Sequence, residues 1–194
     1  MAVTNNDNYA EKMRILSLHG MNKQAWNRYS KKGSWYYEIV APGFKYNLTD
    51  IASSLGIWQL KKCNLLCKKR AKIAEEYSKA FKNIKELELL VQKDYGSNAW
   101  HLYVIKLNLE KLKIDRDSFV RQLKRKNIGA SVHFIPLHLQ PYWKNIYNLK
   151  AIDFPAASSS YKKIVSLPIF PSMARKDTND VIFAVKDIIN KWKI

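Results

Sequence analysis

Cysteine is scarce in this chain, and its two cysteines, Cys63 and Cys67, stand one helical turn apart. No other part of the sequence supplies a second pair of metal ligands at the spacing of a zinc finger. We therefore predict no metal site. Both thiols are expected to be buried and reduced, as is usual for a protein of the cytoplasm.

Long hydrophobic runs are absent as well, and no stretch approaches the roughly 20 apolar residues that a membrane-spanning helix needs. The first twenty residues carry Asp7, Glu11, Lys12 and Arg14 and contain no continuous apolar segment. This pattern is not that of a secretory signal peptide. Internal repeats and low-complexity linkers are missing too, so the 194 residues are expected to form one ordinary domain or two small ones.

Acidic residues are few, 16 against 34 lysines and arginines, and the formal net charge is +18. The basic clusters fall in stretches with helical hydrophobic spacing, where a solvated polar face is the usual role. They are Lys61 with Lys62, residues 68–70, and residues 121–126. Nucleic acid is therefore not a predicted partner, although a basic nucleic-acid-associated protein remains one alternative.

Predicted strands and helices alternate along the chain, which indicates an α/β or α+β layer fold. Residue patterns predict strands at residues 1–6, 87–90, 100–108, 130–135 and 165–167. Helices are predicted at residues 8–18, 48–83, 116–126, 154–163 and 178–192. Asn6 or Asp7 is expected to cap the first helix and Asp115 the third. A bend or break is expected in the second, near Cys63 or Asn64.

Large aromatic side chains crowd residues 21–42, which have no clear helix or strand pattern. They include Trp26, Tyr29, Trp35, Tyr36 and Tyr37. An isolated exposed loop does not favour so many rings, so this segment is expected to pack on something. Its own domain, a partner subunit and a bound ligand are all open as that surface.

Residues 42–51 read Pro-Gly-Phe-Lys-Tyr-Asn-Leu-Thr-Asp-Ile and place an aromatic-basic-aromatic run before a predicted helix start. Asn47 stands where an N-cap residue belongs. The free amides and positive dipole end of such a helix can hold a phosphate, and Lys45 would add a full charge. The alternative is a capped helix that binds nothing.

Residues 131–143 carry a second candidate site, with His133 at a predicted strand end and His138 five residues later. Two prolines stiffen this aromatic loop, and loops fixed in this way often hold ligands. A histidine there could donate or accept a proton near neutral pH. The alternative is a structural loop whose histidines are already hydrogen-bonded.

These segments resemble the DegT/DnrJ/EryC1/StrS family of PLP-dependent aminotransferases, which act on keto sugars of nucleotide-sugar pathways. Four blocks match in the family's order: residues 43–60, residues 99–103 (Ala-Trp-His-Leu-Tyr), residues 129–142 and residues 166–173. Residues 2–20 look like the part that follows the family's cofactor-lysine loop. The resemblance covers nearly the whole chain.

The resemblance implies an α/β fold, namely the C-terminal part of a fold-type I PLP aminotransferase. Residues 1–60 would be the end of the large cofactor domain, and residues 61–194 the small C-terminal α/β domain. The intact family fold implies a homodimer with active sites at the interface. Lys45, Tyr46 and Asn47 would then reach the PLP phosphate of the neighbouring subunit.

The same resemblance places His133, Phe134 and His138 near the cofactor and a nucleotide-sugar substrate. It implies amino transfer from glutamate to a keto sugar. The family's catalytic lysine, the aspartate on the cofactor's pyridine nitrogen and the stacking aromatic are expected in a preceding N-terminal half. Lys31-Lys32-Gly33 is superficially similar to the lysine segment but lies in the wrong place.

Three functions therefore stay open. The favoured one is the C-terminal portion of a sugar aminotransferase that works only with an N-terminal half supplied separately and is inactive alone. The second is a non-catalytic relic or interaction module. The third is the basic nucleic-acid-associated protein.

Overall fold

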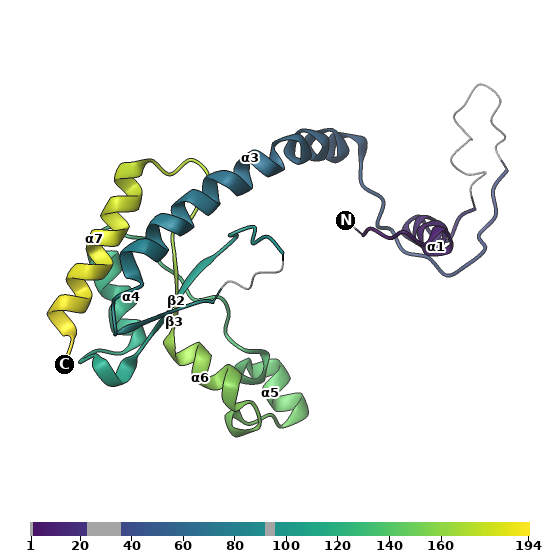
Figure 1. Ribbon diagram of the computed structural model, residues 1–194. Helices are drawn as coiled ribbons and strands as arrows, with labels where there is room; N and C mark the ends of the chain where they lie inside the picture. Colours follow the sequence, from purple (N-terminus) through teal and green to yellow (C-terminus); the bar gives the residue numbers. More distant parts are fainter. Residues whose placement is uncertain (1, 23–35, 92–95) are drawn as a thin grey trace. The chain divides into compact units, whose positions relative to one another are not determined.

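A computed structural model describes residues 2–22, 36–91 and 96–194 of the chain (Figure 1). The chain divides into two units, Met1–Lys61 and Lys62–Ile194. The boundary between them falls inside one long helix, α3 (Asp50–Phe81). Each unit is described by itself below. Trp26, Tyr29 and Trp35 lie outside the described residues, whereas Tyr36 and Tyr37 are exposed.

The first unit contains helix α1 (Asp7–Ser17) and the beginning of α3. The predicted cap of α1 is confirmed, because the Asn6 side chain accepts a hydrogen bond from the Tyr9 amide at 3.1 Å. Gly20 follows the helix with a φ of +73°, and its amide donates to the Ile15 carbonyl at 3.0 Å. His19, which directly follows the C-cap residue Leu18, is left-handed as well, with a φ of +56°, and only for Gly20 is this backbone nearly free of cost.

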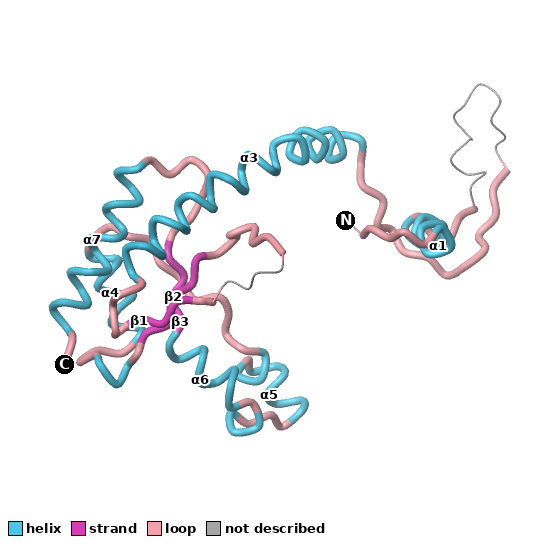
Figure 2. Tube along the Cα trace, in the orientation of Figure 1, coloured by secondary structure: helices cyan, strands magenta, loops and turns pink. Residues whose placement is uncertain are grey.

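The second unit is built on a three-stranded antiparallel sheet in the order β1 (Leu87–Leu89), β2 (Tyr103–Leu107), β3 (Ile164–Leu167) (Figure 2). Register pairs Ile105 with Leu89 on one side and with Val165 on the other. The helices are α4 (Arg116–Arg125), α5 (Pro141–Tyr147), α6 (Pro155–Lys163) and α7 (Arg175–Trp192). Short 3-10 turns, η1 (Leu109–Lys111), η2 (Leu137–Leu139) and η3 (Ala151–Asp153), join them.

The hydrophobic core of the described residues lies entirely in the second unit. The last two turns of α3 supply Tyr77 and Phe81, α4 supplies Phe119, and alternate residues of β2 point inward. Helix α7 contributes a stripe at helical spacing: Val181, Ala184, Val185, Ile188 and Ile189. Helices α4 and α7 lie side by side (Figure 1). Burying these side chains supplies most of the driving force for folding of this unit.

Several predicted elements are confirmed with shifts of a few residues at their ends, but the first predicted strand is wrong. Residues 2–6 form no strand, and residue 1 is not described. The strand predicted at residues 130–135 is also wrong. Only Ser131 pairs there, through two backbone hydrogen bonds with Ser166 of 3.1 and 2.8 Å. Alternating apolar residues do not make a strand unless a partner ladder runs alongside them.

The long helix corrects two further predictions. It runs from Asp50 to Phe81 without the expected break near Cys63 or Asn64. Residues such as Cys and Asn lower helix propensity by less than about 0.7 kcal/mol, which is too little to end a helix. Cys63 is exposed and Cys67 is half-buried, so the thiols are free but not buried as predicted. The helix meets the core only from Ile73 onward.

Candidate functional site

The segment that holds Lys45, Tyr46 and Asn47 is fixed by the end of α1. The Phe44 amide donates to the Leu16 carbonyl at 2.7 Å, and the Tyr46 amide donates to the Ser17 carbonyl at 2.8 Å. Lys45 forms an isolated antiparallel bridge with Leu18. These bonds give residues 44–46 the extended form of a strand although no full strand is present.

Two glycines permit this close approach of chain segments. A side-chain carbon on Gly20 would lie 1.7 Å from the Ala41 carbonyl oxygen, and one on Gly43 would lie 2.0 Å from the Gly20 nitrogen. Both distances are far too short for atoms that are not bonded to each other, so any other residue would push the segments apart. The Pro-Gly pair before the aromatic-basic run therefore serves packing as well as chain reversal.

The extended segment sorts its side chains onto two faces. Phe44 and Tyr46 stack on one face, with ring centroids 5.0 Å apart and planes within 6°. Since successive side chains of extended backbone point to opposite sides, the Lys45 side chain lies on the other face. The Tyr46 side chain is 74% exposed.

Asn47 does not cap α3, which corrects the sequence prediction. The helix begins at Asp50, and Thr49 caps it: the Thr49 hydroxyl accepts from the Ala52 amide at 3.3 Å. The side-chain oxygen of Asn47 is buried and has no hydrogen-bond partner among the described residues. Because buried polar atoms are normally paired, this oxygen would accept a hydrogen bond from a donor that the described residues do not supply.

His133 in the second unit is anchored on β3. Its Nδ1 lies 2.9 Å from the hydroxyl oxygen of Ser166, a buried residue of that strand. Its ring contacts Phe134 edge-on, with centroids 4.8 Å apart. Phe134 itself is 75% exposed. His133 therefore keeps Nε2 for a further partner, while Phe134 offers an apolar ring to solvent or to a ligand.

His138 is placed differently, because it is buried and held on both sides. Its ring stacks on Phe154 at 4.6 Å, and its Nε2 lies 2.9 Å from the Ser158 hydroxyl. That hydroxyl donates its only proton to the Ala151 carbonyl at 2.9 Å, so His138 must be the donor in the first bond. His138 thus ties η2 to η3 and α6, which is a structural role.

Sequence reasoning did not select Ser158 and Ser166, the two serines that hold these histidines. Ser166 begins the block at residues 166–173, one of the four that resemble the family. Serines occur throughout the sequence, and none of its motifs indicates that Ser166 would contact His133, 33 residues away. Lys45, Tyr46 and Asn47 belong to the first unit, whereas His133 and His138 belong to the second.

Comparison with known proteins places these features in a family. The model of the DegT/DnrJ/EryC1/StrS aminotransferase family matches residues 1–186. An uncharacterized protein of Methanocaldococcus jannaschii is 48% identical over 191 residues, which is 98% of this chain and 50% of that protein. The spore coat polysaccharide biosynthesis protein SpsC of Bacillus subtilis is 46% identical over 97% of this chain and 49% of its own length.

Solved structures agree with the sequence matches. The PMP form of Spr1654 from Streptococcus pneumoniae, a protein assigned as a sugar aminotransferase, superposes with a TM-score of 0.84 at 28% identity, and its PLP form with 0.82 at 26%. PseC of Helicobacter pylori, an aminotransferase of pseudoaminic acid biosynthesis, gives 0.83 at 25%.

These alignments cover 97–98% of this chain and 46–48% of the solved chains. The chain therefore spans about half the length of the relatives it matches, and its fold is that of the corresponding part of a fold-type I aminotransferase. On the match of the family model over residues 1–186, this chain belongs to the DegT/DnrJ/EryC1/StrS aminotransferase family.

Proposed function

We propose that this chain forms the C-terminal portion of a PLP-dependent nucleotide-sugar aminotransferase that transfers an amino group, from glutamate, to a keto sugar. The observation that carries the proposal is a match over 97–98% of this chain to half of each relative. One of those relatives, SpsC, is named for polysaccharide biosynthesis. The product would accordingly serve a surface polysaccharide or lipid.

The first unit offers a fit to the cofactor's phosphate. Lys45 carries an exposed ammonium group, and Asn47, two residues later, has side-chain N–H groups that can donate to a phosphate oxygen. A dianionic phosphate is the group that an amide N–H and an ammonium bind together. In this proposal Asn47 and Lys45 hold the phosphate of a PLP in the neighbouring subunit, while Tyr46 packs against Phe44.

PLP, when bound, supplies the electron sink through which an amino group passes between donor and acceptor. This chain's part is to bind and orient. His133, fixed by Ser166, would present Nε2 to the sugar, and Phe134 would cover an apolar face of it. His138 would keep the loop in place through Ser158 and so act on the sugar indirectly.

The proposal assigns no catalytic lysine to the described residues. By the resemblance, the matching blocks would follow the family's lysine loop, and no lysine of this sequence stands in a segment like that loop. We therefore expect the chain to be inactive by itself and to work with the portion that its relatives carry before the matched region. That portion and a second subunit are the proposed partners, and the cytoplasm, which keeps Cys63 and Cys67 reduced, is the proposed location.

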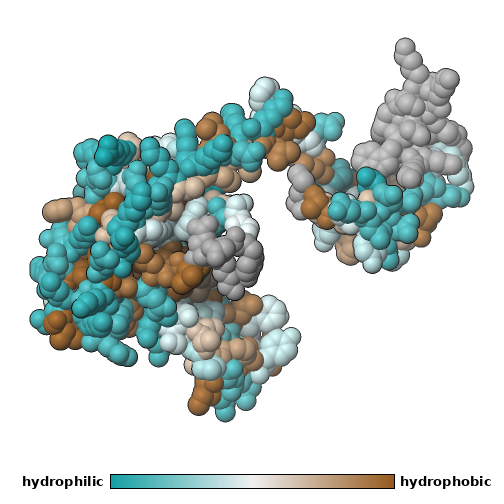
Figure 3. All heavy atoms as spheres, viewed as in Figure 1, coloured by the Kyte–Doolittle hydropathy of each residue, from teal (hydrophilic) through white to brown (hydrophobic). Residues whose placement is uncertain are grey.

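The surface of the first unit supports a missing partner. Its described residues include no buried hydrophobic side chain, while the first turns of α3 expose several, as the brown spheres along this helix show (Figure 3). They are Ile51, Leu55, Ile57, Trp58 and Leu60, each more than half exposed. Exposed apolar side chains gathered on one segment are typical of an interface. Among the described residues, no helix has the length and hydropathy needed to cross a bilayer.

Co-expression with the preceding half of a relative such as SpsC tests the proposal. The purified pair should hold PLP and should transfer an amino group from glutamate to a nucleotide-linked keto sugar, whereas the chain alone should do neither. Replacing Asn47 by Asp puts a negative charge against the phosphate. A lost charge-assisted hydrogen bond is worth roughly 1.5–3 kcal/mol, so PLP should bind about 10- to 100-fold more weakly.

Two results would count against this assignment. If the pair assembles and retains PLP equally well with Asn47 and with Asp at that position, the phosphate role of residues 45–47 is wrong. If the pair assembles but neither binds PLP nor transfers an amino group, the chain is better explained as a non-catalytic interaction module than as part of an aminotransferase. Gel filtration of each pair separates both results from failure to assemble.

A further inference from the structure

A cavity lined by none of the candidate site residues lies between the second half of α3 and the loop that leads from β3 into α7. Its volume is about 490 Å³, and all of its lining belongs to the second unit. The residues that line it are Lys69, Lys72, Ile73, Glu76, Pro171, Ser172, Met173, Arg175 and Thr178.

Three cationic side chains border this cavity from two elements. Lys69 and Lys72 stand three residues apart on one face of α3, and Arg175 is the first residue of α7. All three are exposed, and none takes part in the ion pairs formed between described residues. Unpaired cations that converge on one cavity attract an anion more strongly than cations spread over a surface.

Two carboxylates, Glu76 and Asp177, lie near the cavity, but they do not neutralise its three positive charges. Glu76 lines the cavity and is half-buried, so three positive charges face one negative charge. Asp177 in the first turn of α7 is engaged elsewhere, because its carboxylate accepts from the Ala174 amide at 2.8 Å. The balance favours a ligand with negative charge at one end.

The remaining wall of the cavity is apolar. Ile73 is 7% exposed, and Pro171 and Met173 are half-buried beside it. A bare inorganic anion would leave this wall in contact with water, whereas a ligand with an apolar ring would cover it. Ligand sites commonly combine such a wall with a few charged groups that fix orientation.

We propose that this cavity binds an organic phosphate that carries an apolar ring, of which a nucleoside monophosphate is the simplest example. Lys69, Lys72 and Arg175 hold the phosphate, and Arg175 can donate two parallel hydrogen bonds to it. The ring packs on Ile73 and Met173. The lining of this cavity includes neither residues 45–47 nor His133, so the proposal does not depend on the aminotransferase proposal.

Methyl NMR of the chain labelled at its methionines tests this directly, with AMP, adenosine and inorganic phosphate as the probes. AMP should shift the Met173 methyl signal in a saturable way and leave the signals of Met13 and Met21 in the first unit unchanged. Adenosine and inorganic phosphate should each bind at least about tenfold more weakly than AMP. Adenosine lacks the phosphate for the three cations, and inorganic phosphate lacks the ring for Ile73 and Met173. No shift at Met173, or equal binding of inorganic phosphate, overturns the proposal.

Variants with equal change in net charge separate a site from bulk attraction. The double variant Lys72→Gln with Arg175→Gln should lose most AMP binding. The double variant Lys124→Gln with Arg125→Gln, on exposed positions of α4, should bind AMP as the unaltered chain does. Equal losses in the two double variants would mean nonspecific attraction to a basic protein and would end the proposal.

A gain of binding is a further test, since misfolding cannot produce it. Glu76→Gln removes the one carboxylate from the lining and should tighten AMP binding several-fold. The change should be larger at low salt than at high salt, because salt screens partly exposed charges. Unchanged or weaker AMP binding in a folded Glu76→Gln chain would show that the phosphate does not sit beside Glu76.

Discussion

At the scale of single residues, the N-cap of α3 is not the residue that the sequence pattern predicts but a polar residue two positions later. Thr49 caps the helix, and Asn47 does not. We therefore predict that Thr49→Ala costs about 1 kcal/mol of local helix stability and speeds hydrogen exchange in the first turn of α3. Asn47→Ala should leave that exchange unchanged. Faster exchange in the Asn47 variant instead would restore the capping role to Asn47.

Tyr77 is a second residue with a measurable consequence. It is fully buried and donates from its hydroxyl to the Pro168 carbonyl at 2.9 Å. Burial, with smaller effects from Tyr103, Asp177 and Glu76, raises its pKa far above the ordinary 10.0. Above about pH 10 the unfolded chain therefore loses the Tyr77 proton while the folded chain keeps it. The unfolded state then binds fewer protons, so the free energy of unfolding falls as pH rises.

We predict that stability is constant through neutral pH and declines above about pH 10, measured by denaturant unfolding at each pH. Tyr77→Phe should cost about 1–3 kcal/mol at neutral pH, since it leaves the Pro168 carbonyl without its donor. The same variant should show a shallower decline at high pH. Burial also raises the pKa of Tyr103, so part of the decline should persist. An identical decline with and without Tyr77 would contradict this account.

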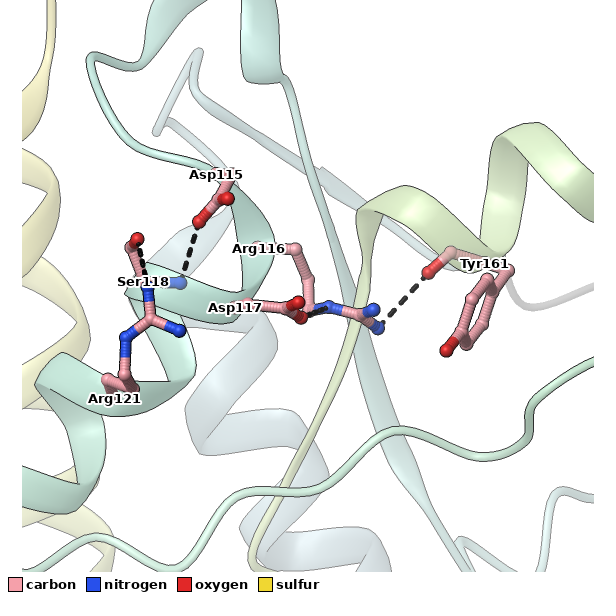
Figure 4. Close-up of polar contacts among 6 residues, drawn as sticks. All are labelled: Asp115, Arg116, Asp117, Ser118, Arg121 and Tyr161. Carbon is pink, nitrogen blue, oxygen red and sulfur yellow. Dashed lines mark hydrogen bonds and ion pairs between the residues drawn. The ribbon is translucent and has the colours of Figure 1, made fainter.

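At the scale of elements, the beginning of α4 is tied to the end of α6 (Figure 4). Arg116 is 8% exposed, donates to the Asp117 carboxylate, and donates to the Tyr161 carbonyl at 3.1 Å. Its guanidinium also lies 4.9 Å from the centroid of the Tyr161 ring. Through this contact α4 holds the end of α6, which leads directly into β3 and Ser166.

The two arginines of α4 give a matched comparison. Arg116→Ala should lower the free energy of unfolding by roughly 1–3 kcal/mol, because it leaves a partly buried carbonyl unpaired. Arg121 is exposed and, among the residues that the structure describes, donates to the Ser118 hydroxyl, so Arg121→Ala should change stability by less than about 0.5 kcal/mol. Equal effects in urea unfolding would mean that the α4–α6 contact contributes little.

At the scale of the whole molecule, stability is concentrated in the second unit. Every buried hydrophobic residue among those described lies between Ile73 and Ile189. Limited proteolysis of the isolated chain should therefore cut first within Met1–Lys61 and leave a resistant fragment that contains residues 73–189. A fragment Lys62–Ile194 made separately should unfold cooperatively. If the first unit resists cleavage as long as the second, it has packing that its described residues do not provide.

The sequence by itself determined where several helices begin. Its motifs also indicated the family. Asn6 and Asp115 cap α1 and α4 as predicted, because a cap acts on amides only two or three residues away. The strands β1, β2 and β3 were predicted from short apolar runs, with shifts of a few residues at their ends. The ordered motif blocks indicated the family without any knowledge of contacts, and the family comparison confirmed it.

Tertiary structure alone decided the features that depend on partners far along the chain. His138 is structural because Ser158, 20 residues away, and Phe154 enclose it, and His133 is fixed by Ser166. Residues 130–135 fail as a strand because β3 offers them a single paired residue. The cavity beside Arg175 likewise combines α3 with a loop about a hundred residues later. Propensity and caps act within one turn, whereas burial and hydrogen-bond partners are set by which distant segments meet.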